Sequence, residues 1–230
     1  MDVVTLLGPP GSGKSTLAEV LLARYSGVRV FRLREFTHEQ AATDRVVARA
    51  LTVGRDPLGW LPDAVAVLLV KRALERYAAD GGVLLLEGYP GTPAQSRAFA
   101  EEFTGRDCGG GAIELAASDT VLRERVGRRL MCPVCDPRRR RPAERHADRP
   151  TGCRSCGTTL ERRADDAPER FPRRLARYRH LAPPTCAALR AGGLPWHTVD
   201  ADRDQPFVEA AALDVFRSLI PAQPRTKGQV

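Results

Sequence analysis

Short apolar runs alternate with longer segments of helical pattern along the chain of 230 residues. The run Val83–Leu86 is apolar at every position, which is typical of a strand buried on both faces of a parallel sheet. The segments that we predict to be strands are 3–7, 27–33, 83–86, 112–115 and 195–199. Because strands that alternate with helices form a parallel sheet covered on both faces, we predict an α/β fold with three layers around a central five-stranded parallel sheet.

Apolar positions at helical spacing predict that the segments between these strands form helices. Asp63 is predicted to cap the helix that follows a turn-rich stretch, and Ser118 or Asp119 is predicted to cap a later helix. The pair Pro183-Pro184 is predicted to break the long helix that precedes the last strand. The predicted helices are 16–24, 37–51, 64–79, 94–103, 121–126, 168–191 and 207–219. The polar residues 221–230 are predicted to be disordered.

A glycine-rich loop, Gly8–Ser15, joins the first predicted strand to the first predicted helix. Its spacing, G-x-x-x-x-G-K-[ST], is that of a phosphate-binding loop, and the strand–loop–helix context makes the pattern specific. The glycines let backbone N–H groups turn toward phosphate oxygens, and the helix N-terminus adds partial positive charge. Lys14 would reach the β- and γ-phosphates, and the Ser15 hydroxyl would ligate Mg²⁺. The loop therefore predicts binding of a nucleoside triphosphate with Mg²⁺.

The net charge of the chain, +8 at pH 7, comes almost entirely from arginine. Arginine binds phosphate oxygens in a bidentate fork, so this charge agrees with a nucleotide substrate, and a nucleic-acid patch is the alternative. No apolar run reaches the roughly 20 residues that a membrane-spanning helix needs. The N-terminus leads directly into the first strand without a signal-peptide pattern, so we expect a cytoplasmic protein with no membrane partner.

Four of the six cysteines form two C-x-x-C pairs, and seventeen residues separate the pairs. This spacing predicts a tetrahedral zinc site, and four protein ligands would make the zinc structural; a redox dithiol is the alternative. The predicted ligands are Cys132, Cys135, Cys153 and Cys156. The surrounding segment 131–161 holds little apolar material, so zinc would supply folding energy that it otherwise lacks. The run Arg138–Arg141 leaves nucleic-acid binding as a second use of this segment.

Three motifs in order along the chain resemble those of adenylate kinase, in its long form with a zinc-bearing lid. The first is the phosphate loop, and the second is Glu87–Gln95, which is similar to the family pattern D-G-F-P-R-T-x-x-Q. The third places Arg125 and Arg129 before the cysteine pairs and Arg163–Asp166 after them. The resemblance covers residues 1 to about 220. It implies an ATP- and Mg²⁺-dependent nucleoside monophosphate kinase, most simply adenylate kinase, which converts ATP and AMP to two ADP.

The resemblance also implies a division of the chain and a set of site residues. A P-loop kinase core of 1–126 and 164–220 would carry an acceptor-binding helical insert, 31–62, and a zinc-binding lid, 127–163. The residues expected to bind ATP and Mg²⁺ are Gly8, Pro9, Pro10, Gly11, Ser12, Gly13, Lys14, Ser15, Thr16, Glu87 and Arg125. The residues expected to be catalytic are Lys14, Arg129, Arg163, Arg174, Asp165 and Asp166. The residues expected to bind the acceptor are Glu35, Gln95, Arg163 and Arg174.

The acceptor side departs from the family pattern. Gly91 stands where D-G-F-P-R has an arginine, and the family's T-G-D-x-x-R is absent. One register puts Glu35 and His38 in place of its aspartate and arginine, and another puts Arg34 and Thr37 there. Losing two charge-assisted bonds of roughly 1.5–3 kcal/mol each would weaken monophosphate binding by orders of magnitude without compensation. The arginines that could compensate are Arg32, Arg34, Arg55 and Arg97.

Two further functions therefore stay open from the sequence. One is a related P-loop kinase that acts on a different small acceptor, and the other is a nucleotide-binding protein with weakened catalysis. In each case we expect nucleotide substrates as partners, without nucleic acid, and a monomeric protein.

Overall fold

The fold is organised around one parallel sheet. The computed structural model describes residues 1–54, 56–105 and 108–220. The strands are β1 (Asp2–Leu7), β2 (Val28–Arg32), β3 (Val83–Glu87), β4 (Gly110–Ala116) and β5 (Trp196–Asp200). They form one five-stranded sheet in the order β2-β3-β1-β4-β5, and every neighbouring pair is parallel. The predicted strands and the predicted α/β fold are confirmed, whereas the predicted disordered tail, 221–230, lies outside the described residues.

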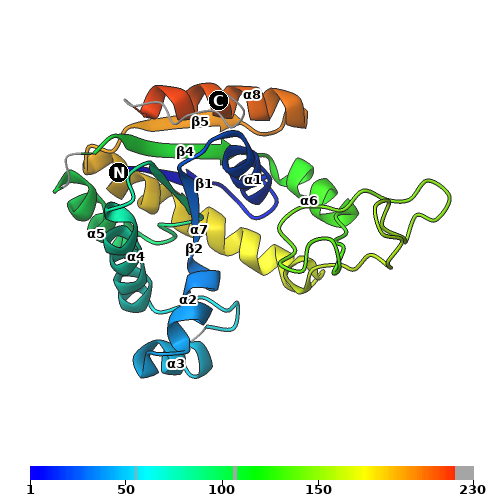
Figure 1. Cartoon of the computed structure of the whole chain (residues 1–230), viewed down its shortest axis with the longest axis horizontal. Coiled ribbons are helices and arrows are strands. Elements are labelled where there is room, and N and C mark those ends of the chain that lie inside the picture. Colours follow the sequence, from blue (N-terminus) through cyan, green and yellow to red (C-terminus); the bar gives the residue numbers. More distant parts are fainter. Residues whose placement is uncertain (55, 106–107, 221–230) are drawn as a thin grey trace.

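Helices cover both faces of this sheet (Figure 1). They are α1 (Lys14–Arg24), α2 (Leu33–Ala41), α3 (Arg45–Thr52), α4 (Asp63–Ala78), α5 (Pro93–Thr104), α6 (Asp119–Arg128), the 3₁₀ turn η1 (Ala164–Asp166), α7 (Phe171–Ala191) and α8 (Gln205–Leu219). Successive strand residues point to opposite faces, so Val4 and Leu6 pack with α1, α6 and α8, while Val3 and Leu7 pack with α4 and α5. β1 contributes to both apolar clusters, and the phosphate loop starts at its carboxyl end.

The predicted single helix 37–51 is wrong, because the structure has α2 and α3 in its place. The Asp44 carboxylate accepts hydrogen bonds from the backbone N–H groups of Val46, at 2.8 Å, and Val47, at 3.2 Å. This N-cap starts a new helix in the middle of the predicted one. The Ser118 cap is confirmed, but Asp63 is the first residue of α4 and not its cap, because its carboxylate accepts from the Gln95 amide at 2.8 Å instead.

The predicted break at Pro183-Pro184 is also wrong, since α7 runs through both prolines. Each proline removes one intrahelical N–H donor, so local chemistry alone would favour a break. The helix is anchored in both apolar clusters, however, with Leu175 buried against one face of the sheet and Leu189 against the other. This tertiary packing keeps the helix continuous.

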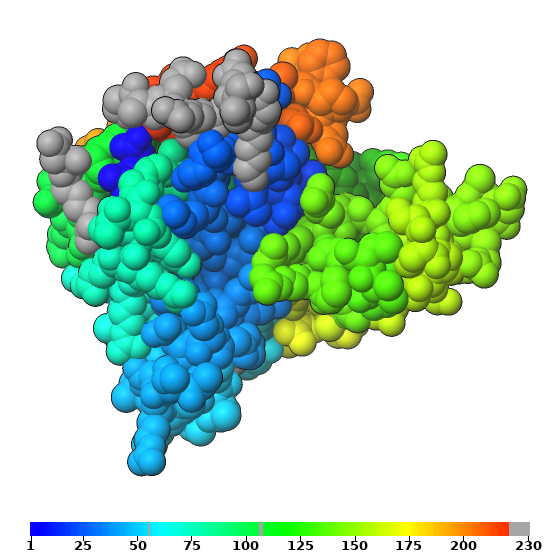
Figure 2. Space-filling model, in the orientation of Figure 1, coloured from blue at the N-terminus to red at the C-terminus, as the bar shows by residue number. Residues whose placement is uncertain are grey.

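Two segments project from the sheet in different directions (Figure 1). One is the pair α2 and α3, and the other is residues 129–163, which the structure describes completely. Within 129–163 there are three isolated antiparallel bridges and no helix, and the buried apolar cluster consists of Cys132, Cys153 and Leu160. Figure 2 shows the green part of this second segment lying against the blue residues around α2. Among the described residues, no helix combines the length and the apolar character that crossing a membrane requires.

Candidate functional site

The phosphate loop folds with its lysine turned inward. Gly8 has φ +142° and Gly13 has φ +102°, and a Cβ at Gly8 would lie 2.6 Å from the carbonyl oxygen of Leu115. Both positions therefore require glycine. Lys14 is the first residue of α1, and its Nζ donates to the carbonyl oxygens of Gly8, at 2.7 Å, and Pro9, at 2.8 Å.

The charge on Lys14 is destabilised by its surroundings. Burial lowers the pKa of its ammonium group to about 8. The Glu87 carboxylate opposes this shift, whereas repulsion from Arg174, Arg129 and Arg163 adds to it. An anionic ligand placed among these four cations would relieve their repulsion, so the site as it stands favours a phosphate group.

Glu87 ends β3 beside the phosphate loop. The Ser15 hydroxyl donates to one oxygen of Glu87, and Arg32 Nε donates to the other at 2.7 Å. A hydroxyl and a carboxylate are the hard oxygen ligands that Mg²⁺ prefers, so Ser15 and Glu87 fit the predicted Mg²⁺ site. Arg32 also donates to Glu19 at 2.7 Å, so it bridges two carboxylates.

Two adjacent aspartates hold two of the predicted catalytic arginines, Arg129 and Arg174. Arg129 donates to both oxygens of Asp166, at 2.8 and 2.5 Å. Asp165 accepts from Arg34 at 3.2 Å and lies 3.4 Å from Arg174. Burial would raise the pKa of Asp165, but Arg174 and Arg34 outweigh it and hold that pKa below its usual value. The lowered pKa keeps Asp165 charged beside its guanidinium partners, and Asp166 orients Arg129 through two hydrogen bonds.

Two cavities lie on either side of Ser15 and Glu87. We call the first, of about 560 Å³, the loop cavity; its walls include Arg125 and Arg129 together with residues 10–16 of the phosphate loop and the start of α1. We call the second, of about 1050 Å³, the α2 cavity; its walls include Glu35 and Gln95. Of the residues predicted to bind ATP, Gly8 and Pro9 do not line the loop cavity but accept the hydrogen bonds of Lys14.

A shared wall joins the two cavities. The residues that line both are Ser15, Glu87, Arg140, Arg163 and Arg174. Four of these were predicted as site residues, and Arg140 was not. Asp165 and Asp166 line neither cavity and reach the site only through the arginines that they bind.

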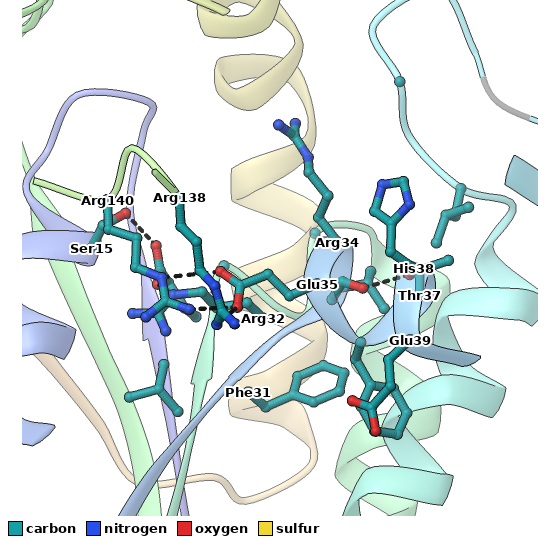
Figure 3. Close-up of a pocket in the computed structure, with 18 of the residues that line it drawn as sticks. Ser15, Phe31, Arg32, Arg34, Glu35, Thr37, His38, Glu39, Arg138 and Arg140 are labelled. Carbon is teal, nitrogen blue, oxygen red and sulfur yellow. Dashed lines mark hydrogen bonds and ion pairs between the residues drawn. The ribbon is translucent and has the colours of Figure 1, made fainter. Parts of the chain in front are cut away.

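Figure 3 shows the side chains in the first turns of α2, where the sequence allowed two alignments with the family's T-G-D-x-x-R. Thr37 is fully buried, and its hydroxyl donates to the carbonyl of Leu33, so the register that uses Thr37 as a phosphate ligand is disfavoured. Glu35 accepts from Arg138 and Arg140, which come from the projecting segment 129–163. The possible substitute Arg97 lines neither cavity, and Arg55 lies outside the described residues.

Trp60 occupies the space beside Gly91. A Cβ at Gly91 would lie 2.7 Å from the Trp60 ring, and the Arg177 guanidinium lies 4.2 Å from the centroid of that ring. Asp56 accepts from the Trp60 backbone N–H at 2.9 Å and pairs with Arg177, so the loop is fixed from two sides. Sequence reasoning missed this cluster; its signal was a tryptophan in a stretch that we interpreted only as a break.

The four paired cysteines come together as predicted. Their Sγ atoms all lie within 4.8 Å of one another, with 3.4 Å between Cys132 and Cys156 and 3.9 Å between Cys135 and Cys153. Zinc–sulfur bonds of about 2.3 Å at tetrahedral angles place sulfurs about 3.8 Å apart, so the cluster fits a zinc ion. Hydrogen bonds from Thr158 lower the pKa of the Cys156 thiol to about 6, whereas hydrogen bonds with Cys156 and Cys132 raise the pKa of Cys135 to about 12, so the thiolate is favoured at Cys156 but not at Cys135.

Comparison with known proteins agrees with this geometry. Residues 4–145 match a family described as an AAA domain. The chain is 32% identical to an adenylate kinase of Sorangium cellulosum over 177 residues, which are 76% of this chain and 79% of that protein. It is 29% identical to an adenylate kinase of Emericella nidulans over 220 residues, 94% of this chain and 82% of the other. It is also 29% identical to an adenylate kinase of Symbiobacterium thermophilum over 218 residues, 94% and 98% of the two chains. The chain therefore belongs to the adenylate kinase family, and it is a nucleoside monophosphate kinase, a phosphotransferase with a phosphate group as acceptor.

Proposed function

We propose that the protein is an adenylate kinase, which transfers the γ-phosphoryl group of ATP to AMP with the help of Mg²⁺ and yields two ADP. The observation that carries this proposal is the pair of cavities that meet at one cationic wall. ATP would lie in the loop cavity and the monophosphate in the α2 cavity, so that their phosphates face each other across Ser15, Arg163 and Arg174.

The loop cavity suits a triphosphate. Lys14 and the loop amides would hold the β- and γ-phosphates, and Arg125, in the wall of the same cavity, would stack on the base. Mg²⁺ at Ser15 and Glu87 would neutralise charge on the β- and γ-phosphate oxygens. In the α2 cavity Gln95 and Glu35 would contact the acceptor nucleotide.

The chemistry asks mainly for alignment and positive charge. An oxygen of the acceptor phosphate attacks the γ-phosphorus, and the bond to the β–γ bridging oxygen breaks, so its electron pair leaves on ADP. Arg129, Arg163 and Arg174 would stabilise the negative charge on the oxygens in flight, and Asp165 and Asp166 would keep those arginines aligned.

We assign residues 127–163 as a zinc-stapled lid and residues 31–62 as the acceptor segment. The cysteine geometry and the small apolar cluster support a structural role for zinc, because this segment buries few apolar side chains. A cytoplasmic location is part of the proposal, since four thiols kept for metal need reducing surroundings. Both cavities are built from one chain, which supports a monomer as the active unit.

One observation favours a second candidate, a kinase for another acceptor. Trp60 fills the space where the family's second acceptor arginine would start, so the α2 cavity holds its ligand differently. The same assay separates the two candidates. Purified protein with ATP and Mg²⁺ receives each nucleoside monophosphate in turn, and diphosphate formation is measured.

We expect ADP from AMP, and we expect Lys14→Met to lower turnover at least about a hundredfold because it removes the phosphate-binding ammonium group. Lys71→Met is the matched control, since Lys71 lies on α4 and pairs with Glu102 away from both cavities. Turnover with another monophosphate but not with AMP would support the second candidate. No turnover with any monophosphate would contradict the adenylate kinase proposal and leave the second candidate only with an acceptor other than a nucleoside monophosphate.

A further inference from the structure

Arg140 is the one residue in the shared wall of the two cavities that no motif explains. The other four members are Ser15, Glu87, Arg163 and Arg174. We propose that Arg140 is a further phosphate-binding residue of this enzyme, supplied from the projecting segment to the point where the donor and acceptor phosphates meet. The proposal rests on the proposed function, because it takes the two cavities to be the donor and acceptor sites.

The backbone around Arg140 is folded to point this side chain inward. The Asp136 carboxylate accepts from the backbone N–H groups of Arg140, at 2.5 Å, and Arg141, at 2.8 Å. Arg139 donates its N–H to the Asp136 carbonyl at 2.9 Å and has φ +53°, the only positive φ among the described residues other than glycine. A left-handed residue costs energy for an arginine, so the turn is held by its contacts and not by local preference.

Two carboxylates from two different helices orient the Arg140 guanidinium, and Figure 3 shows one of them, Glu35. Its Nε and one terminal nitrogen donate to Glu35 on α2, at 3.1 and 2.5 Å, and its other terminal nitrogen donates to Glu19 on α1 at 3.3 Å. A guanidinium has five N–H donors, so these bonds leave two donors free. With a side chain only 19% exposed, Arg140 is a held group facing the cavities and not a surface arginine.

The position of Arg140 in the wall of both cavities favours a phosphate as the ligand of those two donors. Arg140 reaches the α2 cavity, where the family's arginine is replaced by Gly91 and a new side chain would strike Trp60. It also reaches the loop cavity, so a guanidinium at this position touches both substrates. Arginine binds phosphate oxygens with two parallel N–H bonds, which matches the donors that remain.

The neighbouring Arg138 is an example of an arginine that only ties the segment 129–163 to α2 through an ion pair. Arg138 donates to Glu35 at 3.1 Å, but its side chain is 68% exposed, and it lines the α2 cavity but not the loop cavity. If Arg140 served only to tie the two projecting segments together, loss of Glu35 would have the same effect as loss of Arg140.

The test measures binding of inorganic triphosphate by calorimetry, which requires no choice of acceptor base. We expect Arg140→Gln to bind it about tenfold or more weakly than the wild-type protein, and Arg140→Lys to recover part of the loss. Arg154→Gln is the matched control, because Arg154 pairs with Glu144 on the surface of the same projecting segment and lines neither cavity.

Glu35→Gln distinguishes phosphate binding by Arg140 from a role in which Arg140 only ties the segment 129–163 to α2. Glu19 still accepts from the Arg140 guanidinium when Glu35 is neutralised, so as a phosphate ligand Arg140 keeps its place and Glu35→Gln weakens triphosphate binding less than Arg140→Gln does. Equal weakening by Glu35→Gln and Arg140→Gln, or unchanged binding in Arg140→Gln, would overturn the proposal whatever the turnover shows. Wild-type protein that binds triphosphate but does not phosphorylate AMP overturns the proposed activity alone, and wild-type protein that does not bind triphosphate overturns both.

Discussion

Lys14 sits where its own charge is unfavourable until a substrate arrives. Its amine has two backbone carbonyls as hydrogen-bond acceptors but lies near the guanidinium groups of Arg129, Arg163 and Arg174. In the proposed site the same cations would bind phosphate, and the bound phosphate would relieve their mutual repulsion. This arrangement makes the affinity for a triphosphate depend on pH in a definite direction.

We predict that the affinity for ATP falls as pH rises above about 8, where Lys14 loses its proton in the substrate-free protein. Bound phosphate restores the charged form, so the affinity should fall by up to about tenfold per pH unit above that value. Calorimetry at pH 7, 8 and 9 measures it. Lys14→Arg is the control, because an arginine keeps its charge over this range and should remove the slope. A wild-type affinity that is flat to pH 9 would contradict the lowered pKa.

The lowered pKa of Lys14 also makes the free energy of unfolding depend on pH. An unfolded lysine keeps its proton up to a pKa of 10.5, whereas folded Lys14 loses it near 8. Between these values the unfolded chain binds more protons, so the free energy of unfolding contributed by this group rises with pH across that window.

At the scale of whole elements, the sequence predicts best what depends on local signals. The wholly apolar run of β3, the glycine pattern of the phosphate loop and the cysteine spacing each lie within a few residues or carry a fixed period. The start of α3 at Asp44 and the continuity of α7 through Pro183 depend on a cap and on packing that periodicity does not encode. Arg140 meets Glu35 across 105 positions of the chain, so no local pattern could place it.

The loop before α4 gives a prediction at this scale. Gly91→Arg restores the family's arginine in sequence, yet its Cβ would lie 2.7 Å from the Trp60 ring. We expect it to lower the free energy of unfolding by about 1–3 kcal/mol and not to improve acceptor binding. The double change Trp60→Ala with Gly91→Arg should have a lower KM for the acceptor than Trp60→Ala alone, since the new guanidinium then has room.

Urea unfolding and steady-state kinetics measure these effects. Gly127→Arg is the matched control, because a Cβ there meets nothing within 4 Å and the change should leave stability intact. Gly91→Arg as stable as the wild-type protein, or a double variant whose KM for the acceptor is no better than that of Trp60→Ala, would show that Trp60 does not exclude the arginine.

At the scale of the molecule, a rigid sheet carries two projecting segments that meet over the reaction site. The core is held by two large apolar clusters on either face of the sheet, whereas the segment 129–163 has one cluster of three buried residues. Arg140 of this segment donates to Glu35 of α2, and Arg163 and Arg174 line the α2 cavity beside them. If this segment is the proposed lid, assembly of the site depends on the segment keeping its shape without much apolar burial.

Loss of the metal should consequently unfold the lid and spare the sheet. A structural zinc contributes an apparent binding free energy of about 10–16 kcal/mol, far more than three buried residues supply. We predict one zinc per wild-type chain, and we predict that Cys156→Ser loses the zinc, lowers turnover at least about tenfold and retains most of its helical circular dichroism. Cys186→Ser, which changes a thiol of α7 outside the cluster, should keep both zinc and turnover. A wild-type protein free of zinc and fully active, or a Cys156→Ser variant with normal turnover, would show that the bridges and ion pairs of the lid suffice without a metal.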